Sequence, residues 1–182
     1  MNSWYDRGME RVVTTYEDLK EIMNKYPGSV IATSACMGGE LSTQTHNMIT
    51  ARMIKDSVSA EAAHDRIVNF ILFCKEIFGE DFYIECAPGK SEDQIAVNKT
   101  LVSIAKCFDV QMVIGTDAHY LKKEDRFIHE SYLNSKGGER EVASFYEYAY
   151  LQNEDEVKEN IAASIPDMYE KMVATSMEIY NK

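Results

Sequence analysis

The chain has 182 residues, of which 45% are hydrophobic and 27% are charged, a composition typical of one globular domain and not of a disordered segment. It contains no apolar run near the roughly 20 residues that cross a bilayer, and Met1–Arg7 lacks the basic-then-apolar pattern of a secretory signal, so we expect a cytoplasmic protein without membrane partners. The formal net charge is −11, which disfavours binding of a nucleic-acid backbone by this chain as a whole, because such binding depends on cationic contacts with phosphates.

The first predicted elements are a helix, a strand, a turn and a longer helix. Apolar residues at helical spacing predict a helix over 16–26, with a threonine and an aspartate at its start that suit a capping box. The short, partly β-branched run 29–33 predicts a buried strand, and Gly38-Gly39 marks a turn after it. A long helix is predicted over 60–78, because apolar residues recur at helical spacing on one face, and Gly79 suits the position after its end.

The middle of the chain repeats this order. The run 81–86 predicts a second strand, 91–108 a helix with an apolar stripe, and 111–115 a third strand. Strands that alternate with helices at this spacing indicate β-α units around a parallel sheet or barrel. The fold class is therefore α/β.

After the third strand the pattern weakens. A helix is predicted over 124–135, a loop over 136–140, and a tyrosine-rich segment that can pair as a strand over 145–150. A short acidic helix follows over 154–160, and Pro166 opens a last helix, since proline suits a first helical turn.

The strongest candidate for chemistry is the pair Asp117 and His119, directly after the third predicted strand. Residues i and i+2 of an extended backbone point to the same side, so a carboxylate and an imidazole can face one cation, a ligand mix that suits zinc, manganese or iron. Sites in parallel α/β folds lie beyond the carboxyl ends of strands. The alternative is that Asp117 caps the next helix and His119 packs or faces water.

One of the four cysteines is a second candidate metal ligand. Cys36 follows the first predicted strand beside the glycine turn and is either a soft metal ligand or a buried, inert thiol. Glu85 and Cys86 end the second strand, where alternation sends them to opposite faces, so at most one points inward. No C-x-x-C pair occurs, which excludes a zinc ribbon, and we expect Cys74 and Cys107 to be small buried hydrophobes.

The remaining histidines are weaker candidates. His46 and His64 lie among polar residues and are expected to be solvated, whereas His129, on the helix after Asp117 and His119, either approaches their site or has a structural role. No G-x-S-x-G, Walker A or H-E-x-x-H motif occurs. The sequence therefore offers metal-site candidates and no nucleophile triad or nucleotide loop.

Several segments together carry a family resemblance. They are 30–41 (VIATSACMGGEL), 82–85 (FYIE), 113–120 (VIGTDAHY), 123–125 with 129–130, 165–168 and 175–179. In this order and at these intervals they resemble the polymerase-and-histidinol-phosphatase (PHP) domain of the bacterial DNA polymerase III alpha subunit. The match spans nearly the whole chain.

The resemblance implies a distorted (β/α)7 barrel with parallel strands, followed by C-terminal helices. It implies up to three divalent metals, zinc or manganese, held by nine side chains at the strand ends, and three of these map onto Cys36, Asp117 and His119. The others belong to earlier motifs, including an H-x-H pair, so the site is expected to be incomplete. We expect one domain, the C-terminal part of the PHP domain, with a lead-in over 1–14, β/α units over 15–135, and a loop and helices over 136–182.

The functional expectation is a fragment of a replicative DNA polymerase. In the parent the PHP site hydrolyses phosphodiesters at 3′ ends or has become a structural brace, and the fragment itself is expected to be inactive. Its expected partners are the remainder of the alpha subunit, DNA through other domains, and further copies of itself through an exposed strand edge. The alternatives are a stand-alone phosphoesterase similar to histidinol phosphatase and a purely structural interaction module.

Overall fold

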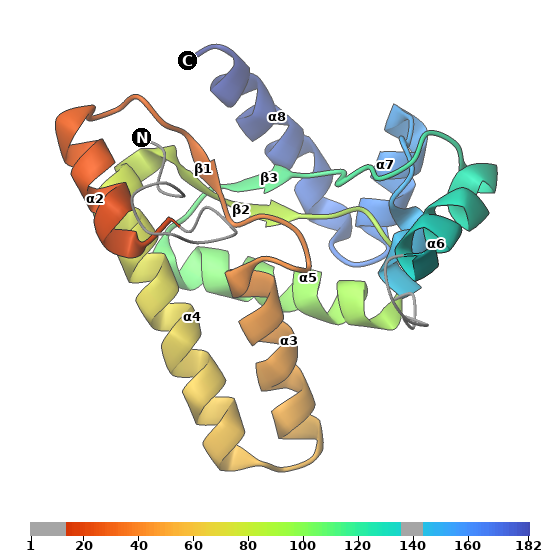
Figure 1. Cartoon of the computed structure of the whole chain (residues 1–182), viewed down its shortest axis with the longest axis horizontal. Helices are drawn as coiled ribbons and strands as arrows, with labels where there is room; N and C mark the ends of the chain where they lie inside the picture. The colour runs from red at the N-terminus through yellow and green to blue at the C-terminus, as the bar shows by residue number, and fades with distance from the viewer. Residues whose placement is uncertain (1–13, 136–143) are drawn as a thin grey trace.

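The computed structural model describes residues 14–135 and 144–182 and has a three-stranded parallel sheet at its centre (Figure 1). The strands are β1 (Ala32–Thr33), β2 (Phe82–Cys86) and β3 (Met112–Ile114), in the order β1-β2-β3. Thr33 pairs with Tyr83, and Cys86 pairs with Ile114. Because all three strands run in one direction, their carboxyl ends meet at one edge of the sheet.

Helices surround this sheet and make up most of the described chain. The α-helices are α2 (Tyr16–Lys25), α3 (Glu40–Met53), α4 (Ser57–Phe78), α5 (Glu92–Phe108), α6 (Arg126–Ser135), α7 (Glu154–Ala162) and α8 (Tyr169–Tyr180). Short 3-10 turns lie at η1 (Gly79–Asp81), η2 (Lys123–Asp125), η3 (Ser144–Tyr148) and η4 (Pro166–Met168). In Figure 1, α3 and α4 form a hairpin that projects below the sheet, α5 crosses beneath it, and α8 crosses β3 obliquely and packs against it.

The predicted α/β class with parallel strands is confirmed, and most predicted elements lie where expected. The predicted buried strand over 29–33 is one exception, because β1 covers only Ala32–Thr33 and neither residue is buried. Side-chain caps explain where helices begin: Thr15, Asp56, Ser91 and Asn153 each accept a backbone N–H from the first turn of the following helix. The three described strands do not by themselves make a closed barrel. The lead-in up to residue 13 and the predicted loop over 136–140 lie outside the described residues.

Helix α3 was not predicted from the sequence. Its buried side chains include the polar Ser42, Gln44 and Thr45, so the apolar stripe that indicates a helix is interrupted. The helix packs against α4 and α5, and these contacts, absent from any local pattern, select its conformation.

The predicted strand over 145–150 is wrong. The segment forms the 3-10 turn η3, and only Tyr150 makes an isolated parallel bridge, to Tyr120. The amide of Gln152 donates to the carbonyl oxygen of Tyr148 at 2.6 Å, which holds the backbone in a turn that is incompatible with a regular ladder.

The main apolar core joins the sheet to the helices. Its fully buried members include Ile71 of α4, Ile84 of β2, Leu101 of α5 and Met172 of α8. No helix of the described residues is long and apolar enough to cross a membrane.

The cysteines divide between core and surface. Burial raises the pKa of Cys74 and of Cys86 to about 12, so both thiols stay neutral and inert. Cys107 is exposed on α5, which corrects the prediction that it is buried, because it lies one step outside the helix's buried stripe.

Candidate metal site

Two strands deliver the candidate ligands through tight turns at the carboxyl edge of the sheet. After β1, the backbone N–H of Ser34 donates to the carbonyl oxygen of Tyr83 at 2.9 Å, and Ala35 then turns the chain with a φ of 61°. After β3, Gly115 donates to the carbonyl oxygen of Cys86 at 3.1 Å, and Asp117 turns the chain with a φ of 46°. Such left-handed conformations are uncommon outside glycine and are found often at functional sites.

Cys36 and Asp117 meet across these turns. Both line one small cleft, which Gly89 and Tyr148 also line. Burial of the thiol and its hydrogen bond with the Asp117 carboxylate raise the pKa of Cys36 above its ordinary value. The free thiol is therefore neutral, and it becomes a metal ligand only when a cation displaces its proton.

The ring of His119 is oriented by its own turn. Its Nδ1 lies 2.7 Å from the carbonyl oxygen of Asp117 and 3.9 Å from that residue's Oδ1. Because a carbonyl only accepts, Nδ1 carries the proton and Nε2 keeps its lone pair, which is the tautomer that metal-binding histidines adopt. The left-handed turn at Asp117 brings Asp117 and His119 together. The prediction had instead assumed an extended backbone, in which residues i and i+2 point to the same side.

The three candidate ligands do not surround one point: Asp117 contacts Cys36 on one side and His119 on the other. The cleft lined by Cys36 and Asp117 is not lined by His119, and within 14–135 and 144–182 no three His, Cys, Asp or Glu side chains are placed to hold a metal ion together. The donor set of thiol, carboxylate and imidazole nevertheless suits zinc or manganese, and the tautomer of His119 fits a cation on its Nε2.

Glu85 and Cys86 point to opposite faces of β2, as predicted. Cys86 is fully buried in the core, whereas the Glu85 carboxylate accepts a hydrogen bond from Thr33 Oγ1 at 2.8 Å. The Glu85 side chain crosses Gly115 so closely that a Cβ there would lie 2.0 Å from Oε1. Gly115 therefore leaves room for a carboxylate beside the strand ends.

Sequence reasoning missed the cluster that surrounds His119. Helix α6 brings His129 to within 5.3 Å of the His119 ring, between ring centroids, and η3 brings Tyr146 to within 5.2 Å. Burial, and then the nearby His119, lower the pKa of His129. The sequence left open whether His129 approaches this site or has a structural role, and the structure places its ring against that of His119. No local signal announces Tyr146, because it comes from the irregular segment after residue 143.

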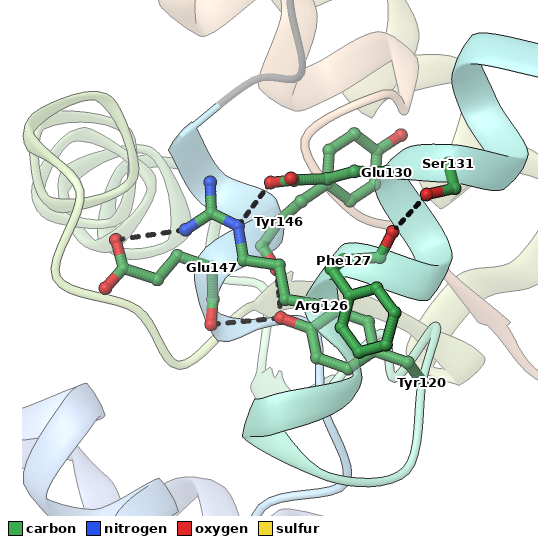
Figure 2. Close-up of polar contacts among 7 residues, drawn as sticks. All are labelled: Tyr120, Arg126, Phe127, Glu130, Ser131, Tyr146 and Glu147. Atoms are coloured by element: carbon green, nitrogen blue, oxygen red, sulfur yellow. Dashed lines mark hydrogen bonds and ion pairs between the residues drawn. The ribbon is translucent and has the colours of Figure 1, made fainter.

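Polar contacts fix this cluster in place (Figure 2). Arg126 of α6 lies between two carboxylates, with Nε 2.6 Å from Glu130 and Nη1 3.6 Å from Glu147. The Tyr120 hydroxyl donates to the carbonyl oxygen of Tyr146 at 2.6 Å. Helix α6, η3 and the turn that carries His119 are thus tied together.

The other two histidines lie outside this region. His64 is exposed on α4, as predicted. His46 is half-buried, with Nε2 3.3 Å from Asp93 Oδ1 of α5, so it contacts a carboxylate and is not merely solvated.

Replacing Gly39 by alanine is expected to open the turn that carries Cys36. A Cβ at this position would lie 2.5 Å from the carbonyl oxygen of Ser34 and 3.1 Å from that of Cys36, and backbone atoms yield less readily than flexible side chains. We expect the free energy of unfolding in urea to fall by about 2 kcal/mol. Gly38→Ala is the matched control, because its Cβ would meet only the Cys36 sulfur at 3.9 Å; equal effects of the two substitutions would contradict the prediction.

Comparison with known proteins finds DNA polymerases. Over 179 residues, or 98% of this chain, the sequence is 43% identical to a DNA-directed DNA polymerase of Bacillus phage SPbeta and to the probable DNA polymerase YorL of Bacillus subtilis. Over 109 residues it is 33% identical to the DNA polymerase III subunit alpha of Aquifex aeolicus. The chain spans 14% of the length of the first two relatives and 8% of the third. No family model matches the chain.

Proposed function

We propose that this chain is the C-terminal part of the PHP domain of a replicative DNA polymerase of the polymerase III alpha type, acting as one segment of a longer polypeptide. The observation that carries the proposal is the 43% identity over 179 residues to a polymerase. It is supported by the positions of the family-like segments 30–41 and 113–120, which form the two turns at the carboxyl edge of the parallel sheet. The distorted barrel belongs to the same proposal.

The proposed role of the site is to contribute ligands to a divalent metal centre, with zinc or manganese as the cation. When bound, such a cation generates hydroxide near neutral pH and neutralises charge that develops on a phosphate. Cys36, once its thiol proton is displaced, would supply a sulfur ligand, and Asp117 would supply the carboxylate beside that thiol. His119 would supply Nε2 while its Nδ1–H stays on the Asp117 carbonyl. Because no three donor side chains among the described residues converge on one cation, the affinity of the site is expected to be low.

The proposed activity of the parent is DNA synthesis with metal-dependent hydrolysis at 3′ ends, in the cytoplasm. The net charge of −11 favours contact with DNA through other domains, so the proposed partner of this chain is the remainder of the subunit, with self-association when that is missing. A structural brace is the second candidate, favoured by the absence of a closed three-ligand group among the described residues. The polymerase names of the relatives argue against a stand-alone phosphoesterase.

Titration of the purified chain with zinc or manganese, followed by calorimetry, tests the proposed site. We expect weak binding that Asp117→Asn and His119→Ala each weaken about tenfold or more, because loss of a ligand costs at least as much as loss of an outer-shell partner. His64→Ala is the control, since His64 is exposed on α4. Absence of binding, or equal binding by all four proteins, would favour the structural brace.

A further inference from the structure

We propose that His129 is a positioning residue for His119, an inference that rests on the proposed metal site. His129 lies on α6, and its ring meets that of His119 edge to face, with centroids 5.3 Å apart and planes at 69°. Tyr146 meets His119 in the same manner, at 5.2 Å and 80°. Edge-to-face contact is a favoured arrangement of aromatic rings, and two such contacts restrict the imidazole to one orientation.

The positioning rings are themselves held. His129 and Tyr146 pack on each other with centroids 4.8 Å apart, and Tyr120 lies 5.7 Å from His129. The ion pairs of Arg126 with Glu130 and Glu147 join α6, which carries His129, to η3, which carries Tyr146 (Figure 2). The orientation of His119 therefore depends on contacts that lie outside the Asp117 turn.

The proposal assigns His129 a role through its ring, since no three donor side chains among the described residues converge on one cation. Its Nδ1 is buried and has no hydrogen-bond partner among the described residues, and such an unpaired atom lowers stability. A phenylalanine at this position would keep the ring and remove the unpaired nitrogen. The substitution His129→Phe therefore distinguishes a role of the ring in packing from a role of its nitrogens in metal ligation.

The consequence for the site concerns Nε2 of His119. One ring orientation keeps Nδ1–H on the Asp117 carbonyl and aims Nε2 in one direction. Outer-shell residues that orient a metal ligand commonly change metal affinity by 10–100-fold. We therefore expect loss of the His129 ring to free the imidazole and to weaken cation binding.

Three proteins test the inference: the purified chain, His129→Phe and His129→Ala, each checked for folding by circular dichroism. Long-range 1H–15N spectra of the imidazoles report which nitrogen of His119 carries the proton, and zinc titration reports affinity. We expect His129→Phe to keep the single tautomer and to bind zinc within about threefold of the unsubstituted chain, and His129→Ala to mix tautomers and bind about tenfold more weakly. His64→Phe is the matched control.

Two results would overturn the inference. If His129→Ala leaves both the tautomer of His119 and the zinc affinity unchanged, the ring has no positioning role. If His129→Phe and His129→Ala weaken zinc binding equally while the tautomer persists, His129 is a ligand instead. Zinc binding that is insensitive to Asp117→Asn would refute the proposed metal site. In that case the tautomer of His119, measured without zinc in the unsubstituted chain and in His129→Ala, would still decide the role of His129.

Discussion

Replacing Asn98 by leucine is expected to lower the free energy of unfolding by about 3 kcal/mol. Asn98 of α5 is fully buried, and its Nδ2 donates to the carbonyl oxygen of Ala87 at 3.0 Å and to Ser164 Oγ at 3.1 Å. Its Oδ1 accepts from the amide of Gln94 at 2.9 Å. Leucine fills a similar volume but removes one hydrogen-bond partner from the Ala87 carbonyl, the Ser164 hydroxyl and the side-chain amide of Gln94. A buried polar group that loses its partner lowers stability.

Urea unfolding followed by circular dichroism measures this loss. Lys99→Leu makes the matched control, because Lys99 is the next residue of the same helix and is exposed; its expected effect is within about 0.5 kcal/mol. A midpoint for Asn98→Leu equal to that of the control would show that water or rearrangement satisfies the three groups.

The same network couples the core to the candidate site. Ala87 precedes Pro88 and Gly89, which line the cleft beside Cys36 and Asp117. The amide of Gln152 also donates to the carbonyl oxygen of Pro88, at 3.3 Å. We infer that this wall of the cleft is fixed from the protein interior, and that substitution of Asn98 moves it.

Local sequence pattern was sufficient for the elements whose apolar spacing is regular. The helices α4 and α5 place apolar residues at the helical period, and β2 begins as a short, continuously apolar run. Both patterns can be recognised from the local sequence alone. Helix α3 was missed for the opposite reason: Thr45 is fully buried although polar, and its conformation is selected by packing against α4 and α5.

The candidate site was predictable to the extent that parallel strands dictate it. Cys36 and Asp117 converge because each follows a parallel strand and carboxyl ends share one edge. The ring cluster around His119 was not predictable, since it depends on side-chain contacts to irregular backbone, such as that of the Tyr120 hydroxyl with the Tyr146 carbonyl. Such contacts leave no periodic trace in the sequence.

The purified chain is expected to leave a 3′-labelled primer-template intact in millimolar manganese or zinc. Hydrolysis of a phosphodiester at this site needs firmly held cations, and the described residues bring no three donor side chains to one cation. The net charge of −11 also disfavours recruitment of DNA without such cations. Metal-dependent trimming by this chain that Asp117→Asn abolishes would show that the three candidate ligands suffice for chemistry.

The positive counterpart is a chimera in which this chain replaces the matching segment of the Bacillus phage SPbeta polymerase, which is 43% identical over 179 residues. We expect the chimera to trim the primer in a metal-dependent manner, and Asp117→Asn to slow trimming at least about 100-fold, since removal of a ligand exceeds the effect of removing an outer-shell partner. Asparagine loses the charge that faces Cys36 but keeps the size of the side chain, so the fold is preserved and DNA synthesis by the same chimera is expected to be unchanged. The control is a His64→Ala chimera, whose trimming is also expected to be unchanged. A chimera that synthesises DNA but never trims would assign the domain the role of a structural brace, whereas loss of synthesis in Asp117→Asn would mean that the residue supports the fold of the subunit and not a separate hydrolytic site.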